Sequence, residues 1–480
     1  MRILKTTLLA VSILATPQLF AKDSWTELFN GKDLTGWTQK TGNATYFVED
    51  GCIVGQMHVP GGGTNSFLCT TKEYDNFILE LDFKADPRLN SGLQIRSAYA
   101  DKTVSTEWQG KTITVHPGYV FGYQVEIDTD LKGKTFTGGI YDEHRRGSYI
   151  QPDDGPKGPH GISFTEWNRK ITNPDDWNHL RVVAIGDHFK TYLNGVLRAD
   201  FHDPMTAKGF FGLQVHNSNE KSSDGAQVRF KNIRIQKVSA RDEKPEPPMN
   251  TLTEKEKKEG WRLLWDGKTI DGWQSAIAPG FPEEGWEIHD GELMVTNNNG
   301  GESQRGGDII TKERFSNFEL KVDFKTTPGC NSGIKYFVQP KLSAITGTGT
   351  TAPIGSAIGP EYQILDDLRH PDAKLGHDGD RTLGSLYDLI PASKDKKPNY
   401  IGEWNHALII AKGNHIEHWL NGEKIVEYDR NTPEFNKLVA GSKYHAIEGF
   451  GDWPDGHILL QEHGSMVSFR NVKIRVLDTK

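Results

Sequence analysis

The sequence is poor in cysteine, and this limits how far covalent bonds can hold the fold. Its 480 residues contain only Cys52, Cys69 and Cys330, which allow at most one internal disulfide and leave a free thiol. A Cys52–Cys69 bridge would be local. Each half of the chain is long enough to bury a core without a bridge, so the fold cannot depend on one.

The sequence also has no excess of positive charge and no long apolar run. The chain carries 56 Lys and Arg against 64 Asp and Glu, a formal net charge of −8. Nucleic-acid binding needs clustered Lys and Arg for phosphate contacts. No apolar run approaches the roughly 20 residues that span a bilayer. The sequence therefore predicts neither a nucleic-acid partner nor a membrane span.

Familiar catalytic and cofactor motifs are absent as well. We find no G-x-S-x-G, no phosphate-binding loop, no H-E-x-x-H, and no G-x-G-x-x-G after a predicted strand. Redox chemistry by this chain alone is therefore not expected. No organic cofactor is predicted, and a divalent metal ion stays open as a cofactor.

The first 21 residues have the layout of a secretory signal peptide. "MRILK" is positively charged, "TTLLAVSILA" is a short apolar stretch, and "TPQLFA" ends on a small residue at Ala21. No cysteine follows the apolar stretch, so a lipid anchor is not expected. The mature protein is predicted to be periplasmic or secreted.

The rest of the chain is an internal repeat. "ELFNGKDLTGW" (27–37) matches "LLWDGKTIDGW" (263–273), and "WNHLRVVAIGDHFKTYLNG" matches "WNHALIIAKGNHIEHWLNG" later in the chain. Further matches follow in the same order, which indicates one duplicated domain. We refer to the two copies as module one (22–238) and module two (259–480).

A linker separates the modules at residues 239–258. "SARDEKPEPPMN" is rich in charge and proline, as linkers often are. Thr253 and Glu256 then have the spacing of a capping box, which predicts a short helix before module two.

Both modules read as β-structure. "FILELDFKA", "GYQVEID", "LRVVAI" and "HFKTYL" are short, alternating or β-branched segments bounded by turn residues. Asn194-Gly195 and Asn421-Gly422 predict type I′ hairpins. Many short strands in about 200 residues favour an all-β fold, here two tandem jelly-roll β-sandwich domains.

Alternation along a strand places particular polar residues on one face. Gln461 and His463 share a face in "ILLQEHG", as do Gln214 and His216 in module one. A one-sided sheet also turns a polar face to water. Water does not require Gln-x-His in two diverged modules, however, so a sugar-binding groove on a concave face competes with that explanation.

A second strand pair carries a polar row. The row is Gln124, Glu126 and Asp128 in module one, whereas Glu361 and Gln363 appear in the reverse order in module two. Several further side chains are groove candidates, although each also suits a surface or packing role: Tyr141, Tyr387, Asp388, Lys335, Arg96, Arg145 and Trp453. The loop "HPDAKLGHDGD" resembles a cation-binding loop but matches no EF-hand or zinc spacing.

These motifs together resemble the 3-keto-disaccharide hydrolase family. The resemblance rests on "LFNGKDLTGW", "NSGLQIRS", "NSGIKYF", "EYQILDD", "RTLGSLYDLIPA" and "ILLQEHG", and extends over nearly the whole mature chain. It implies concanavalin A-like (laminin G-like) jelly rolls that act on glycosides already oxidised at C3. A sugar oxidoreductase that makes the 3-keto group would be a functional partner.

The resemblance also suggests site residues. The family pattern runs through Glu361, Gln363 and Asp366, the Tyr387-Asp388 pair and His463. Module one departs from it with Gln124-x-Glu126 and the ending "QVHN". Module two is therefore the expected active copy.

Chemistry assigns roles to these groups. A 3-keto group acidifies the C2 proton, whose removal lets the C1 substituent leave; hydrolysis and elimination share this first half. The reaction needs a base, an electrophile at the C3 oxygen and an acid. His463 is the predicted base. Lys335, Tyr387 or a divalent cation would polarise the ketone, and Glu361 or Asp366 would serve as acid or metal ligand.

Three functions compete at this point. The chain is a 3-keto-glycoside-cleaving enzyme, a non-catalytic lectin-like protein, or a protein with one active and one binding module. The fold alone does not choose between them. The predicted carbohydrate contacts lie on or near the polar strands: Gln363, Gln461, Asp388, Trp453, Gln124, Glu126, Asp128, Arg96, Tyr141, Arg145 and His216.

Overall fold

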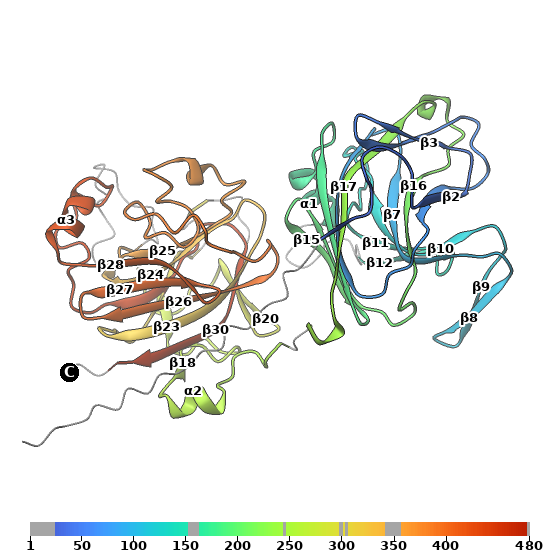
Figure 1. Ribbon diagram of the computed structural model, residues 1–480. Coiled ribbons are helices and arrows are strands. Elements are labelled where there is room, and N and C mark those ends of the chain that lie inside the picture. The colour runs from blue at the N-terminus through green and yellow to red at the C-terminus, as the bar shows by residue number, and fades with distance from the viewer. Residues whose placement is uncertain are drawn as a thin grey trace, which may run out of the picture.

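The computed structural model describes residues 25–151, 163–242, 246–296, 301–302, 306–340 and 357–477. The predicted signal peptide lies outside these residues. Each module forms its own β-sandwich, and the two sandwiches lie side by side (Figure 1). The described strands pair antiparallel within each sheet. The predicted all-β fold of two tandem jelly rolls is confirmed.

Module one packs two sheets around a buried apolar core. From edge to edge, one sheet contains β15 (Val196–His202), β14 (His188–Leu193), β13 (Asn178–Ile185), β6 (Phe77–Ala85), β17 (Gln227–Lys237), β4 (Cys52–Gln56) and β3 (Thr45–Glu49), and β1 (Thr26–Glu27) pairs with β17. The other contains β12 (Tyr149–Gln151), β11 (Ile140–Glu143), β10 (Val120–Ile127), β7 (Ser91–Tyr99), β16 (Phe210–Val215), β5 (Ser66–Thr70) and β2 (Trp37–Thr41). A separate hairpin joins β8 (Val104–Trp108) to β9 (Lys111–Val115), and α1 spans Phe164–Ile171.

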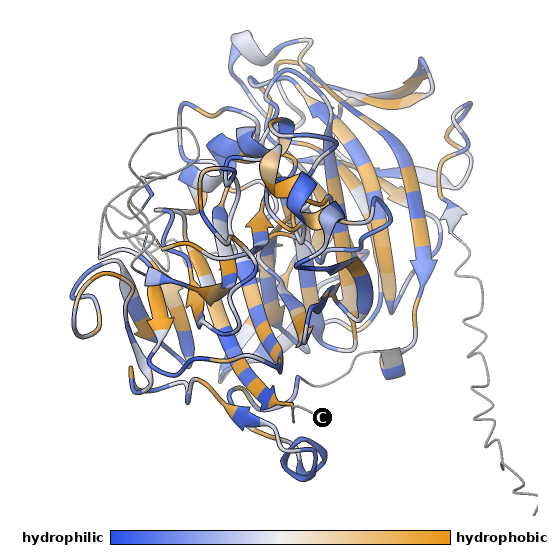
Figure 2. Ribbon diagram, turned by 90° about the vertical axis from the view of Figure 1, so that its left-hand side faces the viewer, coloured by the Kyte–Doolittle hydropathy of each residue, from blue (hydrophilic) through white to orange (hydrophobic). Residues whose placement is uncertain are grey.

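Module two repeats this plan around a second core. One sheet contains β20 (Trp286–His289), β21 (Glu292–Val295), β30 (Val467–Val476), β23 (Phe318–Thr326), β26 (Trp404–Lys412), β27 (His415–Leu420) and β28 (Glu423–Asp429), and β18 (Arg262–Leu263) pairs with β30. The other contains β19 (Trp273–Ser275), β22 (Ile309–Thr311), β29 (His457–Leu460), β24 (Asn331–Val338) and β25 (Glu361–Leu365). Figure 2 shows hydrophobic and hydrophilic residues alternating along these strands, as one buried face per sheet requires.

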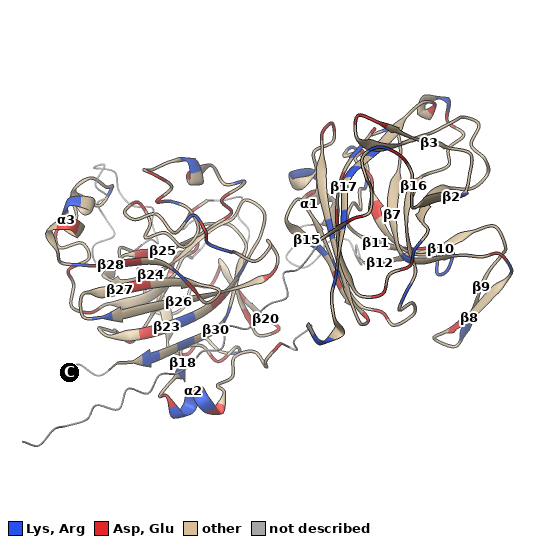
Figure 3. Cartoon of the chain, viewed as in Figure 1, with Lys and Arg blue, Asp and Glu red and all other residues tan. Residues whose placement is uncertain are grey.

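Local sequence signals account for several turns and caps. Asn194, Gly195, Asn421 and Gly422 all have positive φ, as predicted for two type I′ hairpins. Helix α2 (Glu254–Lys258) begins after Thr253 with the predicted capping box, and Figure 3 shows its mixed charges. Helix α3 (Pro433–Ala440) follows β28. The three cysteines are buried and free, so no bridge contributes to the fold.

The two modules contact each other through the β14–β15 hairpin. The backbone N–H of Leu197 donates to the carbonyl of Ile401 at 2.8 Å, and the Tyr192 hydroxyl donates to Glu403 at 2.7 Å. Arg369 also reaches across and donates to the carbonyl of Asn194. The described residues contain no helix that is both long and apolar enough to traverse a lipid bilayer.

Candidate active site

Module two contains a pocket of about 130 Å³ against the β24–β25–β29 side of its second sheet. Its polar lining comes from strands, strand ends and loops far apart in the sequence. These polar residues are Glu302, Asn331, Lys335, Glu361, Gln363, Tyr387, Lys443, Tyr444, Gln461 and His463. The structure therefore brings together the predicted residues Lys335, Glu361, Gln363, Tyr387, Gln461 and His463.

Strand register explains why the central pair faces the same space. Lys335 on β24 lies opposite Glu361 on β25, and Gly333 lies opposite Gln363. A Cβ at Gly333 would stand 2.2 Å from an Oε1 atom of Glu361. Gly333, the glycine of the "NSG" motif at the start of β24, therefore leaves room for the Glu361 side chain to lie across this strand.

Lys335 is a buried cation with a carboxyl partner. Its Nζ lies 3.6 Å from Oδ2 of Asp308 and donates to the carbonyl of Ala357 at 3.2 Å. Burial opposes the charged form, but Asp308, Glu361 and Glu302 outweigh it, so the pKa of Lys335 is raised. Lys335 remains an ammonium group at neutral pH.

The carboxyls around this ammonium hold protons more tightly than usual. Burial raises the pKa of Asp308 to about 7 and also raises the pKa of Glu361, while Lys335 opposes both shifts. Asp308 accepts a hydrogen bond from the backbone of Glu462 at 2.9 Å. One ammonium shared by two buried carboxyls favours a neutral acid in the site at physiological pH.

His463 follows β29 and stands beside a third carboxyl. Its Nε2 lies 3.7 Å from Oε2 of Glu302 and 3.4 Å from the amide nitrogen of Asn331. Its Nδ1 is buried and has no hydrogen-bond partner among the described residues. The Oε1 atoms of Gln363 and Gln461 are likewise buried and unpartnered there. Buried polar atoms are normally bonded, so these three indicate a pocket prepared for a polar ligand.

Lys443 reaches the pocket from the loop after α3. Its Nζ lies 4.1 Å from the centre of the Tyr387 ring and 5.1 Å from that of Tyr444. Burial lowers its pKa, although Glu361 acts in the opposite direction. Sequence reasoning missed Lys443, Glu302 and Asp308. The segment around Lys443 has no counterpart between β15 and β16 of module one, and that unmatched insertion was the available signal.

Tyr387 and Asp388 form hydrogen bonds that fix the side of the pocket next to Lys443. The Tyr387 hydroxyl donates to Asp372 at 2.8 Å, so its proton is already engaged. Asp388 accepts from Arg381 at 2.7 Å and from the backbone N–H of Lys443 at 2.8 Å. Asp388 therefore positions Lys443, and the described lining of the pocket does not include it.

Two other predicted residues of module two stand apart from the described lining. Asp366 accepts hydrogen bonds from the backbone of Gly329 at 2.8 Å and from Arg369 at 3.1 Å, so it closes the end of β25. Trp453 packs edge-on against Phe450 with ring centres 5.8 Å apart. Both contacts are structural.

Module one has a pocket of about 360 Å³ at the corresponding place. Gln94 lies opposite Gln124, and Gly92 opposite Glu126, so Gln94 and Gln124 stand where module two has Lys335 and Glu361. Gln94 donates to Gln124 at 2.8 Å. Burial raises the pKa of Glu126 to about 7. Module one therefore has a pair of amide side chains where module two has a lysine opposite a carboxyl group.

Some of the residues predicted for module one line its pocket, and others do not. Gln124, Glu126, Tyr141 and His216 line this pocket, together with Glu143, His144 and Tyr149. The described lining does not include Arg96, Arg145 or Asp128.

Each of these three side chains has a structural contact instead. Arg96 is buried and donates to the carbonyl of Asp75 at 2.7 Å. Arg145 pairs with Asp142 at 2.7 Å. Asp128 accepts from the backbone of Asp130 at 3.0 Å.

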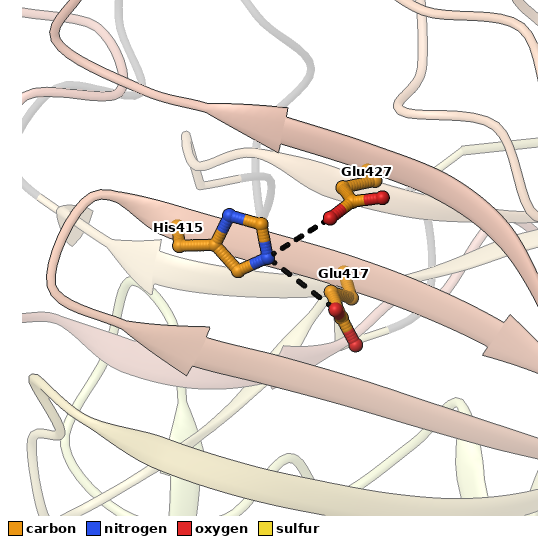
Figure 4. A group of neighbouring side chains, drawn as sticks. All are labelled: His415, Glu417 and Glu427. Atoms are coloured by element: carbon orange, nitrogen blue, oxygen red, sulfur yellow. Dashed lines mark hydrogen bonds and ion pairs between the residues drawn. The ribbon is translucent and has the colours of Figure 1, made fainter.

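A group with metal-ligand chemistry lies on the other sheet of module two. His415, Glu417 and Glu427 bring three ligand atoms within 4.8 Å of one another on β27 and β28 (Figure 4). Lys424 stands beside both carboxylates, and His415 also contacts Asp429 at 3.0 Å. An ammonium already occupies the place of a cation, so this group is an ion-pair network.

Two histidines of β27 are expected to give opposite pH dependences of stability. His418 is fully buried: its Nδ1 donates to the carbonyl of Gly384, and its Nε2 accepts from Tyr336. Burial lowers the pKa of His418 from 6.5 to about 4. Below pH 6.5 this histidine is protonated in the unfolded chain but stays neutral in the native protein. The free energy of unfolding therefore falls as the pH drops toward 4. At about 1.4 kcal/mol per pKa unit, the loss approaches about 3 kcal/mol.

Urea unfolding between pH 8 and pH 4 measures this dependence. His418→Gln should flatten the acid limb relative to the parent. His415 provides the contrast, because its carboxylate partners raise its pKa, mainly through Asp429. Its stabilising contribution is complete below pH 6.5 and is lost as the pH rises through the raised value. An unchanged acid limb in His418→Gln would refute the assignment.

The fold and the pocket together define a class of protein. It is a tandem jelly-roll protein with a pocket of ionisable groups in its second module. The family of the 3-keto-alpha-glucoside-1,2-lyase-like domain matches residues 24–236 and 260–475. These two matches cover most of the chain, so the chain belongs to this family. The resemblance seen in the sequence is confirmed.

Individual relatives cover about one module. The chain is 38% identical over 238 residues to a 3-keto-disaccharide hydrolase of Bacteroides thetaiotaomicron, a match of 46% of this chain and 79% of that protein. A solved structure of a candidate glycosyl hydrolase from Parabacteroides distasonis is 34% identical, covering 48% of this chain and all of that one, with a TM-score of 0.40. The carbohydrate-binding module CBM66 of Bacillus subtilis is 20% identical, covering 42% and 95%, with a TM-score of 0.27.

Proposed function

We propose that this chain is a glycoside-cleaving enzyme that acts on 3-keto-glycosides, including 3-keto-disaccharides, and that module two carries out the reaction. Family membership and the Bacteroides relative support the substrate class. The observation that carries the proposal is the convergence of an ammonium, a buried carboxyl and an unpartnered imidazole nitrogen in one pocket. A lectin needs no such set of titrating groups.

His463 is the base in this proposal. Nε2 faces Glu302 and the Asn331 amide, whereas Nδ1 has no partner among the described residues and is the nitrogen left for a substrate. Nδ1 takes the C2 proton of the sugar, and the electron pair moves toward the C3 carbonyl. A positioned general base in contact with the proton typically contributes about 10²- to 10⁴-fold.

Lys335 and Glu361 complete the step. The Lys335 ammonium stabilises negative charge on the C3 oxygen, in a buried place where such an interaction is strong. Glu361, whose pKa is raised by burial, is the acid that donates a proton to the oxygen at C1 as the C1–O bond breaks. The products are an enone and the free alcohol; addition of water at C1 gives net hydrolysis.

A 3-keto-glycoside must come from oxidation of a C3 alcohol. We therefore propose a sugar oxidoreductase as the functional partner. The amino-terminal signal pattern supports a site of action outside the cytoplasm.

We propose a different function for module one, namely sugar binding without cleavage. Gln94 stands where Lys335 would polarise a ketone, so this pocket lacks the electrophile. Its amides, its buried carboxyls and Tyr149 can bond and stack against an unoxidised sugar. This keeps one active and one binding module in a single chain.

The test of the proposed function is aglycone release from a 3-keto-glucoside and from the matching unoxidised glucoside. The purified chain should release the aglycone from the keto substrate alone. The same rate should persist after EDTA treatment, because an ammonium, rather than a metal ion, acts on the ketone. Binding of both sugars with cleavage of neither would instead identify a lectin-like protein.

A further inference from the structure

We propose that Lys443 is a covalent catalyst, whose amine forms an iminium ion with the C3 ketone of the substrate. This inference rests on the proposed function for its substrate class and for the roles of His463 and Glu361. It replaces the enolate of the scheme above with an enamine, so that Lys335 supplies a proton for loss of the C3 oxygen instead of stabilising negative charge on it. Lys443 enters the pocket from the loop after α3, opposite the strands that carry Lys335 and Glu361.

The backbone around Lys443 is held in place. Its N–H donates to Asp388 at 2.8 Å, and Asp388 is itself bound by Arg381. The Nζ atom lies 4.1 Å from the centre of the Tyr387 ring and 5.1 Å from that of Tyr444. These contacts hold the amine at the pocket wall.

The two lysines of the pocket differ in their partners. Lys335 has Asp308 as an ion-pair partner, whereas Lys443 has no carboxylate partner within 4.0 Å among the described residues. The charged groups that influence Lys443 are Glu361, Glu302 and Asp388, which favour its cation, and Lys335, which disfavours it. Burial is the largest effect and lowers its pKa, so the neutral, nucleophilic amine is easier to reach than for an exposed lysine.

Each atom of the step can be followed. The neutral amine adds to the C3 carbonyl to give a carbinolamine, which loses its hydroxyl as water with a proton from the Lys335 ammonium. The resulting iminium draws electrons more strongly than the ketone, so His463 removes the C2 proton more easily. The enamine then expels the C1 oxygen, which takes its proton from Glu361. Water then adds at C1 and gives a proton to the Glu361 carboxylate, and His463 returns its proton to C2. Hydrolysis of the remaining iminium restores the Lys443 amine, gives a proton back to Lys335 and releases the 3-keto sugar.

Reductive trapping tests the covalent bond directly. The probe is 3-keto-1,5-anhydroglucitol, which has the ketone but no leaving group at C1. With sodium cyanoborohydride, the full-length chain should gain one sugar-sized secondary amine, and peptide mass mapping should place it on Lys443. Lys443→Arg, which keeps the positive charge, should gain none. Lys437→Arg is the matched control, because Lys437 lies on the exposed side of α3 in the same segment.

Oxygen exchange provides an independent readout. An iminium route releases the C3 oxygen to solvent, so the wild-type chain in ¹⁸O-water should accelerate label entry into the probe at least tenfold over background. Lys443→Arg should return this rate to background while its thermal midpoint stays that of the parent. A route through a simple enolate keeps the C3 oxygen and gives no acceleration.

The outcomes test the role of Lys443 separately from the proposed cleavage of 3-keto-glycosides. Aglycone release from the 3-keto-glucoside without adduct or exchange would overturn the role of Lys443 and leave the proposed function standing. An adduct on Lys335 would also overturn it. Failure to cleave the 3-keto-glucoside at all would overturn the proposed function itself.

Discussion

Replacement of His463 with glutamine is expected to lower kcat/KM for a 3-keto-glucoside by about 10²- to 10⁴-fold, the usual contribution of a positioned general base. Glutamine keeps the size and polarity of the side chain but cannot take a proton. His463 lines the pocket, and its buried Nδ1 has no partner among the described residues, so the variant should fold as the parent does. Aglycone release from the 3-keto-glucoside measures the effect.

His289→Gln is the matched control for this variant. His289 is on β20 with a side chain 67% exposed, and the variant should retain parental kinetics. Parental activity in His463→Gln would remove histidine from the base role in module two. If cleavage were lost only in His216→Gln, the reaction would belong to module one.

Lys335→Met is expected to have the largest effect on stability. The substitution leaves Asp308 and Glu361 buried beside an apolar chain, and breaking a buried pair in this way typically costs about 3–5 kcal/mol. It also removes the ammonium proposed to stabilise the C3 oxygen. Urea unfolding at pH 7.5 should therefore show a lowered midpoint, and aglycone release should fall by at least about 10²-fold.

A double variant separates these two effects. Lys335→Met with Asp308→Asn removes the uncompensated charge, so most of the lost stability should return while the chain remains inactive. Lys325→Met serves as the surface control, because the Lys325–Glu292 pair at 2.7 Å is partly exposed and should contribute no more than about 1 kcal/mol. Recovery of cleavage in the double variant would show that the ammonium is not the electrophile.

The two modules share a scaffold but differ in the side chains that line their pockets. Strand register keeps Gly92 and Gly333 at equivalent places, which leaves room for a long side chain from the neighbouring strand. The residues beside that space have changed from Lys335 and Glu361 to Gln94 and Gln124. The scaffold is retained in both copies, whereas the side chains at these two strand positions differ.

Part of the candidate site could be predicted from the sequence. Residues two apart on a strand share a face, so Gln461 with His463 and Glu361 with Gln363 were predictable from alternation alone. The loop residues were not. Asp366 follows the polar strand in sequence, but the chain has already turned there, and its carboxylate binds Gly329 and Arg369.

The periodicity of the strands could not predict which charged residues surround the site. Asp308 and Glu302 lie near each other in sequence but far from Lys335, and folding alone brings their charges to the same ammonium. Lys443 belongs to an insertion with no repeat partner, so comparison of the two halves gave it no weight.

The sequence by itself determined the duplication, the all-β character, the two type I′ hairpins and the polar faces of the central strands. These features depend on neighbours in the chain or on a short period, and both are visible in a linear pattern. Only the tertiary structure decided which polar faces enclose a pocket, which carboxyls surround Lys335, and that Lys443 completes the wall. Those properties depend on burial and on contacts between residues distant in sequence, where desolvation and Coulomb interactions set the charge of each group.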